Sequence, residues 1–251
     1  GSYPYYITYG YANDLVALIN YKSGGGGGGT GGLRGDGASR DPLGKRAIDI
    51  PGSGGTGAGG RSFSSLLNYL ELPSTTLKQL VDNTDYKQMT WVGGNAVTWV
   101  DYRYWDSTTV DSLNGEIYVY NRNNGSETRI TSDHAYQEKP FTDGSRVVWI
   151  DYENLSKGRL FCATIDGQNV MEIAPGSGGK DNPRIHGDYI AWEDFSSAQS
   201  DPANADIYLF KLSSGKLTKV CTEQGYQGNP YLSDYFLVWE DYRDKTPADS
   251  N

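Results

Sequence analysis

Residues 187–195 read GDYIAWEDF, and the chain carries close copies of this segment at 94–102, 144–152 and 233–242. Each copy runs through alternating apolar positions to a tryptophan, with an aspartate two positions later and then an aromatic residue. The tryptophans Trp99, Trp149, Trp192 and Trp239 recur at intervals of 43 to 50 residues. A repeat of this length is typical of a solenoid or a β-propeller.

The rest of each repeat consists of short alternating runs. After 187–195, a polar loop leads to a run at 206–212, a turn at 213–215 and a last run at 216–220. Alternation of Tyr, Val, Ile and Trp with polar residues predicts strands, and the short Gly-containing turns predict hairpins. With a further short strand around 183–185, each repeat has four antiparallel strands, which is one propeller blade. No window shows apolar residues at helical spacing, so we expect an all-β fold.

The two ends of the chain set the predicted blade count. Residues 65–80 align with the outer hairpin at 206–220, and 13–21 align with 187–195, with Leu18 in place of the tryptophan. The sequence thus predicts one domain over 1–251 with 18 strands: about five blades, four and a half of them encoded, and a Gly-rich insertion at 24–60 within blade one. In an alternative register, 5–9 and 15–18 form an outer hairpin that completes the last blade, because closing the ring removes an exposed sheet edge. A chain cut from a longer repeat protein would explain the missing strands equally well.

Composition limits the classes of partner. The net charge is −9 and no Lys/Arg cluster is present, which argues against binding to nucleic acids. No apolar stretch is long enough to span a bilayer and no signal peptide is evident, although the Gly1-Ser2 start would fit a leader that has been removed. Cys162 and Cys221 fall in predicted strands, so we expect buried free thiols rather than a disulfide. The sequence contains no Cys/His cluster, so no zinc site is predicted.

The insertion at 24–60 contains 17 glycines in 37 positions. Such a segment cannot bury enough apolar surface to offset its ordering entropy, so a flexible or irregular loop is expected. It contains the tripeptide Arg34-Gly35-Asp36 and a Gly-rich run at 52–57. The first arises easily by chance, and the second lacks the Lys-Ser/Thr and helix of a P-loop, so we assign a function to neither.

The repeated tryptophan and aspartate are predicted to be structural. A group that recurs at the same strand position in each blade solves the same packing problem each time. The tryptophan offers a large apolar face to the neighbouring sheet, and the aspartate can accept N–H groups of the following loop. The residues in this class are Trp99, Asp101, Trp149, Asp151, Trp192, Asp194, Trp239 and Asp241.

The loops that follow this motif are better candidates for binding, because they differ between repeats and emerge on one face of a propeller. Exposed aromatic and polar side chains there suit carbohydrate or protein recognition. The candidates are Arg103, Tyr104, Trp105, Asp106, Asp111, Asn114, Asp201, Asn204, Arg243 and Asp244. Asp106, Asp111 and Asn114 supply oxygen ligands of the kind that Ca²⁺ prefers, at a spacing that matches no EF-hand. No other cofactor is expected.

Residues 182–194, followed by 205–215, resemble the TolB-like propeller repeat, in the version found in archaeal and bacterial cell-surface proteins of the surface-layer type. The resemblance covers about 61–251. It implies an extracytoplasmic, usually non-enzymatic propeller used for adhesion or assembly, and it supplies no catalytic residue. The repeats lack the Ser-Pro-Asp-Gly turn typical of TolB itself, so a periplasmic role like that of TolB is the less favoured alternative. Sequons at Asn124 and Asn154 would be usable on an exported protein.

These observations favour an extracellular or surface-displayed propeller that binds a surface protein or a glycan or assembles with itself, rather than an enzyme. One alternative is a polysaccharide-active, lyase-like enzyme with an active site on the propeller. His134 and His186 occupy corresponding first-strand regions of adjacent repeats and would be its metal ligands. Another alternative is an accessory propeller of a larger enzyme. Fold alone does not separate these functions.

Overall fold

The structure is a computed structural model that describes residues 6–12, 15–23, 63–71, 76, 78–83, 85–104, 115–133, 135–153, 157–176, 178–196 and 204–243. All the regular secondary structure within these ranges is β-strand, apart from turns and bends, and every strand pair is antiparallel. The all-β class predicted from the sequence is therefore confirmed. The insertion predicted at 24–60 lies outside the described residues, between the second and third strands.

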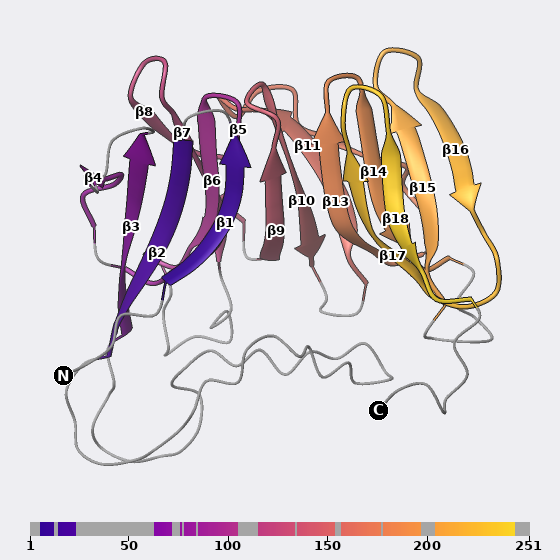
Figure 1. Cartoon of the computed structure of the whole chain (residues 1–251), viewed down its shortest axis with the longest axis horizontal. Helices are drawn as coiled ribbons and strands as arrows, with labels where there is room; N and C mark the ends of the chain where they lie inside the picture. The colour runs from indigo at the N-terminus through magenta and orange to yellow at the C-terminus, as the bar shows by residue number, and fades with distance from the viewer. Residues whose placement is uncertain are drawn as a thin grey trace.

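The described strands form four four-stranded sheets and one two-stranded sheet (Figure 1). Sheet one contains β1 (Tyr6–Ala12), β2 (Leu15–Ser23), β3 (Phe63–Glu71) and β4 (Lys78–Gln79). Sheet two contains β5 (Lys87–Gly93), β6 (Ala96–Asp101), β7 (Glu116–Asn121) and β8 (Ser126–Arg129). Sheet three contains β9 (Tyr136–Thr142), β10 (Arg146–Tyr152), β11 (Arg159–Thr164) and β12 (Met171–Glu172). Sheet four contains β13 (Lys180–His186), β14 (Tyr189–Asp194), β15 (Asp206–Lys211) and β16 (Lys216–Cys221), and sheet five contains β17 (Gln227–Leu232) and β18 (Leu237–Asp241).

Sheet four shows how the repeat specifies its hairpins. In the β14–β15 pair, Trp192 lies opposite Tyr208 and Ile190 lies opposite Phe210. Because side chains alternate along a strand, these residues share one face of the sheet, and the residues that flank Trp192 lie on the other. The turns before β14 and β16 place Gly187 and Gly215 at φ of 54° and 65°, a conformation that glycine adopts without strain.

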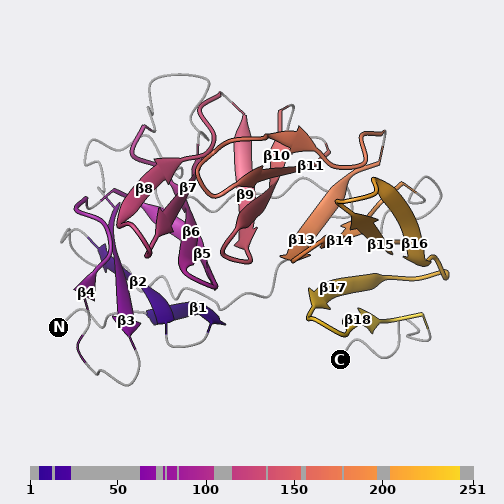
Figure 2. The same cartoon turned by 90° about the horizontal axis from the view of Figure 1, so that it is seen from above.

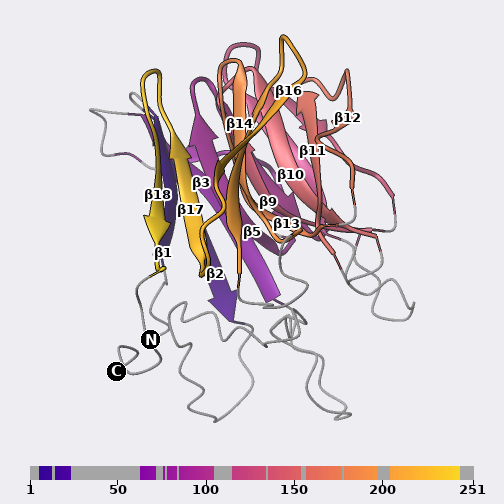
Figure 3. The ribbon, with the colours of Figure 1, turned by 90° about the vertical axis from the view of Figure 1, so that its right-hand side faces the viewer.

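The sheets follow one another in chain order along an arc, with sheets one and five at its two ends (Figures 2 and 3). The first strand of each sheet contacts the first strand of the next, so β1, β5, β9, β13 and β17 line the inside of the arc. We call this surface the inner wall. The third and fourth strands lie farther out, which is the arrangement within propeller blades.

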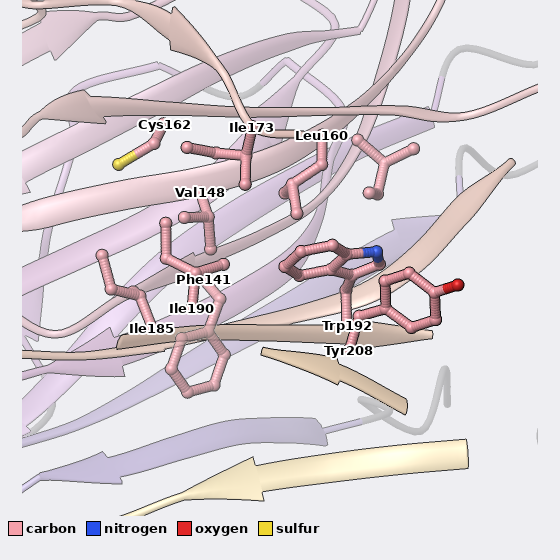
Figure 4. Packing of buried hydrophobic residues seen from close by; sticks show 10 residues of the cluster. Phe141, Val148, Leu160, Cys162, Ile173, Ile185, Ile190, Trp192 and Tyr208 are labelled. Carbon is pink, nitrogen blue, oxygen red and sulfur yellow. The ribbon is translucent and has the colours of Figure 1, made fainter. Parts of the chain in front are cut away.

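Three apolar clusters lie between successive sheets. Trp99 of sheet two packs with Ala17 and Leu67 of sheet one. Figure 4 shows the corresponding cluster between sheets three and four, in which Trp192 of sheet four packs with Val148 and Leu160 of sheet three. In both cases the tryptophan faces the preceding sheet, which is the packing that the repeat predicts. Cys162, which belongs to this second cluster, and Cys221 are both buried free thiols, as expected.

The predicted register of the first repeat is confirmed. β1 and β2 join β3 and β4 in one sheet, rather than forming an outer hairpin of the last sheet. No closed sheet occurs among the described strands, so ring closure and the number of blades in the ring stay predictions.

Candidate functional site

The repeated aspartate holds both the tryptophan and the turn that follows it. The indole N–H of Trp99 donates to Asp101 Oδ2 at 2.9 Å, and that of Trp192 donates to Asp194 Oδ2 at the same distance. The other carboxylate oxygen of Asp101 accepts the backbone N–H of Arg103, and Asp194 likewise accepts that of Ser196. Asp241 accepts the backbone N–H of the residue two positions on at 3.1 Å. This geometry supports the structural interpretation of the motif.

Asp101 also belongs to a buried charge cluster. Its carboxylate lies 3.8 Å from the Lys87 ammonium, and both side chains are fully buried. The Arg103 guanidinium binds the same carboxylate at 2.8 Å. Burial acts to raise the pKa of Asp101, but the hydrogen bonds from Arg103 and the charge of Lys87 outweigh it and leave the pKa below its usual value.

Two of the candidate binding residues in the loops, Arg103 and Arg243, make contacts within their own repeats. Arg103 donates to Asp101, pairs with Glu127 at 2.7 Å and stacks on the Tyr118 ring with its guanidinium 4.2 Å from the ring centre. Arg243 repeats the first of these contacts with Asp241. Such arginines brace the edge of a sheet, and these contacts occupy their Nε and Nη2 donors.

The remaining loop candidates divide into two groups. Asn204 accepts the backbone N–H of Gly225, and Tyr104 is 57% exposed with the Arg129 guanidinium 4.5 Å from its ring centre. Tyr104 is therefore the described candidate best placed to meet a partner. The other candidates, including the proposed calcium ligands, lie outside the described residues; they are Trp105, Asp106, Asp111, Asn114, Asp201 and Asp244.

The inner wall carries polar groups that the sequence analysis did not single out. Each first strand from β5 to β17 has a bulge with a non-glycine residue at positive φ, namely Met89, Lys139, Asn182 and Asn229. A bulge re-aims side chains and bends the strand. Prolines follow three of these residues, at 140, 183 and 230. Recurrent prolines within strands mark bulges, so this pattern could have revealed them.

The bulges organise a hydrogen-bond network across sheets three to five. The Lys139 ammonium donates to Asn182 Oδ1 at 3.0 Å and also binds Asp181. The fully buried Glu193 carboxylate accepts from the Asn182 amide and, at 2.8 Å, from the backbone N–H of Asn229. Apolar clusters join sheets one to four to one another. Sheets four and five are instead joined by polar contacts of Glu193.

On the inner wall, the Arg184 guanidinium of β13 lies against two aromatic rings. Trp91 and Phe141 have ring centres 4.2 Å apart, and the Arg184 guanidinium lies 4.9 Å from the Phe141 ring centre and 5.7 Å from that of Trp91. Burial lowers the pKa of Arg184, while the Glu193 charge opposes this shift. A cation on two aromatic faces is a stable arrangement and stiffens the wall.

The histidines contribute no assembled metal centre in the described part of the chain. His186 Nε2 lies 2.7 Å from Asp234 Oδ1, in an exposed contact between the first turns of sheets four and five. His134 lies outside the described residues, so the two-histidine site of the enzyme alternative stays a prediction. No group of three or more His, Cys, Asp or Glu side chains suited to a metal ion occurs among the residues that are described.

No family model matches the chain, and no curated protein sequence matches it. No helix among the described residues is long and apolar enough to span a membrane.

Several solved structures resemble the fold. An acylaminoacyl peptidase from Pyrococcus horikoshii aligns at 13% identity and a TM-score of 0.57, over 90% of this chain and 33% of its own. An oligogalacturonate lyase in complex with manganese aligns at 11% identity and a TM-score of 0.54, over 88% of this chain and 54% of its own. TolB from Acinetobacter baumannii is also similar, at 14% identity and a TM-score of 0.48, over 68% of this chain and 40% of its own.

The chain spans less than two thirds of the length of each of these structures. At such low identity, the likeness to the peptidase and the lyase shows the fold alone. The chain is an all-β protein with a propeller-like arrangement of antiparallel four-stranded sheets.

Proposed function

We propose that this chain is a non-enzymatic binding and assembly module, displayed outside the cytoplasm, that docks the open face of sheet five onto another β-sheet of the same kind. The repeat resemblance supports a cell-surface location, with the periplasm as the alternative. The observation that carries the proposal is the exposure of sheet-packing positions at the end of the arc.

The positions that flank the repeated tryptophan show this exposure. In β6, β10 and β14 the flanking residues face the following sheet or its bulged strand, and all six are 0% exposed; they are Thr98, Val100, Val148, Ile150, Ala191 and Glu193. In β18 the equivalent residues are Val238, which is 55% exposed, and Glu240, which is also exposed. A position that is buried in three repeats and exposed in the fourth is a packing surface without its cover.

The surroundings of Val238 extend this surface. Tyr231 on β17 is 49% exposed, and Tyr235 and Phe236 before β18 are 87% and 70% exposed. Contiguous apolar exposure of this kind marks a site of protein interaction. Within the arc, the same face of each sheet is covered by the tryptophan-bearing face of its successor, as where Trp192 meets Val148. The fitting partner is therefore an aromatic-rich antiparallel sheet.

A second copy of the chain can supply an antiparallel sheet with its predecessor-facing side free, although Leu18 replaces the tryptophan on that side. Sheet one stands at the opposite end of the arc, and its far side corresponds to the side that every later sheet turns toward its predecessor (Figure 2). Sheet five of one copy would thus meet sheet one of another head to tail. Such a contact uses two different surfaces, so it is heterologous rather than two-fold symmetric.

Sedimentation equilibrium tests this proposal with the substitution Val238→Asp. The wild-type chain should self-associate between roughly 1 and 200 μM, the range of weak to moderate protein interfaces. Val238→Asp should weaken association at least about tenfold, because a carboxylate would be buried at the contact without a partner. The matched control is Leu217→Asp on the outer strand β16, where Leu217 is 44% exposed. Both variants replace an exposed side chain, so circular dichroism should show unchanged folding.

Two results would overturn the proposal. One is a wild-type chain that stays monomeric across the whole concentration range. The other is equal association of Val238→Asp and the wild type. The lyase-like alternative is tested separately by incubation with oligogalacturonate and Mn²⁺, for which we expect no turnover.

A further inference from the structure

The outer edge of β18 has no neighbouring strand among the described residues. In sheets one to four the second strand pairs with a strand on each side, whereas β18 pairs with β17 alone. The backbone N–H of Tyr242 donates to the Tyr226 carbonyl on the β17 side. Because backbone groups alternate in direction along a strand, those of Leu237, Trp239 and Asp241 point to the outer edge. This edge therefore presents the donors and acceptors with which a further strand can pair.

In sheets two, three and four, the third strand places an aromatic ring against the repeated tryptophan. The ring centres lie 5.7 to 5.8 Å apart, and a cationic group lies 4.2 to 5.3 Å from the centre of the third-strand ring. The sets are Trp99, Tyr118 and Arg103; Trp149, Phe161 and Arg159; and Trp192, Tyr208 and Lys219. Contact with both a tryptophan and a cation is thus a constant feature of the third-strand ring.

Sheet five has the tryptophan and the cation, but no described ring stacks on them. Trp239 is partly exposed, whereas the other three repeated tryptophans are 0–2% exposed. Arg243 binds Asp241 in the way that Arg103 binds the aspartate of its own repeat, yet its side chain is 43% exposed against 20% for Arg103. A planar guanidinium beside an indole suits an aromatic ring. Trp239 and Arg243 therefore form one wall of a pocket for an aromatic side chain.

A groove on sheet four adjoins this pocket. Its volume is about 310 Å³, and its lining residues are Tyr189, Leu209, Lys211, Ser214, Lys216 and Thr218. Leu209 lies opposite Ala191, which flanks Trp192, so it shares the side of sheet four that faces sheet five. At the matching position of sheet three, Cys162 is 2% exposed and packs in one cluster with Tyr208, the third-strand ring of the next sheet. The groove is therefore the surface that a third strand of sheet five would cover.

The third strands of sheets two and four show which sequence fits such a site. They read EIYVY at 116–120 and DIYLF at 206–210. In β15, Tyr208 lies opposite the tryptophan and Phe210 lies opposite Ile190, so both rings point toward the preceding sheet. On sheet five, the first of two such rings would contact the wall formed by Trp239 and Arg243. The second would lie over the groove of sheet four.

We propose that β18 captures an extended segment of a partner protein as the third strand of sheet five, with an aromatic side chain of that segment bound by Trp239 and Arg243. The segment carries two aromatic residues two positions apart, each preceded by an aliphatic residue, as in 207–210. When a strand adds to an exposed sheet edge, main-chain hydrogen bonds give affinity and side-chain pockets give specificity. This site is the edge of sheet five, whereas the assembly proposed above uses its face, so neither proposal depends on the other.

Fluorescence anisotropy of a labelled peptide with the sequence of residues 204–212 tests the site, with the whole chain as the receptor. We expect saturable binding below about 200 μM of chain. The same peptide with Tyr208→Ser and Phe210→Ser keeps the backbone but lacks both rings. It should bind at least about tenfold more weakly, because the contacts with Trp239 and Arg243 are lost.

Two N-methylated peptides distinguish strand pairing from contact of the rings alone. In sheet four the N–H of Leu212 donates to β14, so by alternation the N–H groups of Tyr208 and Phe210 also face the second strand. Methylation of the amides of Tyr208 and Phe210 should abolish binding. Methylation of those of Ile207 and Leu209, which point away from the second strand, should leave binding largely intact.

Variants of the chain locate the site. Leu237→Pro removes a donor from the outer edge of β18, a position where proline is tolerated, and should weaken binding at least about tenfold with an unchanged circular dichroism spectrum. Its matched control, Leu237→Ala, keeps the donor and should bind more tightly than Leu237→Pro. Arg243→Lys keeps the charge beside Asp241 but lacks the planar guanidinium, so it should bind several-fold more weakly.

Three results would overturn the proposal. The first is the absence of saturable binding of the 204–212 peptide. The second is equal binding of the two N-methylated peptides, and the third is equal binding of the peptide that lacks both rings. The two proposals for sheet five are also tested apart, since Val238→Asp should still bind the peptide and Leu237→Pro should still self-associate.

Discussion

Replacing Asp101 with asparagine should destabilise the chain far more than the same replacement at Asp151, although both occupy one position of the repeat. Asp101 accepts from the Trp99 indole and from Arg103, and lies 3.8 Å from the Lys87 ammonium. Asparagine has one acceptor oxygen and no charge. It would leave the fully buried Lys87 without the charge that compensates it, which typically costs about 3–5 kcal/mol.

Asp151 should contribute less to the free energy of unfolding than Asp101 does. Its partner Arg159 has a side chain that is 38% exposed, and pairs of this kind contribute about 1 kcal/mol or less. Burial raises the pKa of Asp151, so its ionised form is disfavoured in the folded state. Asp151→Asn should therefore change the free energy of unfolding by about 1 kcal/mol or less. In a chain of this size 1 kcal/mol corresponds to about 2–4 °C, so the two variants should differ in Tm by about 10 °C.

The pH dependence of the free energy of unfolding gives a second test, because the pKa shifts of Asp101 and Asp151 have opposite signs. The folded pKa of Asp101 is lowered, so its stabilisation is present above the unfolded pKa and is lost as pH falls through the folded pKa. The folded pKa of Asp151 is raised, so the cost of its ionisation is present above that pKa and disappears as pH falls toward the unfolded value. Acidification should thus shrink the deficit of Asp101→Asn.

Urea unfolding followed by tryptophan fluorescence at several pH values measures both effects. Asp241→Asn is the matched control, since Asp241 occupies the same position in the exposed β18 and its substitution should have a small effect. A free energy of unfolding for Asp101→Asn equal to or above that of Asp151→Asn would refute the reasoning.

Three further substitutions or reactions probe the packing. Gly93→Ala should cost at least about 2 kcal/mol, because a Cβ would lie 1.8 Å from the Thr142 carbonyl oxygen; Gly176→Ala, with open space around it, should change the urea midpoint little. The Cys162 thiol, whose pKa burial raises to about 12, should react with a thiol reagent only after unfolding, and fast labelling of the native chain would contradict this. Glu193→Gln should speed proteolysis within sheet five while sparing sheet two, since Glu193 joins sheet five to sheet four; equal acceleration in both sheets would argue against that role.

The fold was largely predictable because the same pattern of apolar and polar residues recurs in each repeat. The alternation around Trp99, Trp149 and Trp192 fixes which side of each strand faces the preceding sheet, and a shift of one residue would turn every tryptophan toward the following sheet. The degenerate first repeat was also placed correctly, since β2 pairs with β3 over its whole length. Ring closure depends on contacts between the chain ends, about which local alternation carries no information.

The candidate site was less predictable, for a physical reason. Sequence shows which residues are polar, but it does not show where their donors are already used. Arg103 is a plausible ligand contact by position, yet its guanidinium binds Asp101 and Glu127. Conversely, Trp149 is indistinguishable from Trp99 in sequence, and only the direction of the Asp151 side chain leaves its N–H unsatisfied.

The contacts between successive sheets also give the arc a graded resistance to opening. Sheets two, three and four each pack against two neighbours, whereas sheet five packs against sheet four. In such a linear array, stability is close to a sum of unit terms and nearest-neighbour terms, and fluctuations begin at the ends. Amide hydrogens of β10 should therefore exchange with deuterium last, and those of β18 early. A partner that covers Val238 would add the missing neighbour and slow exchange throughout sheet five, so docking would be visible as protection of backbone amides remote from the contact itself.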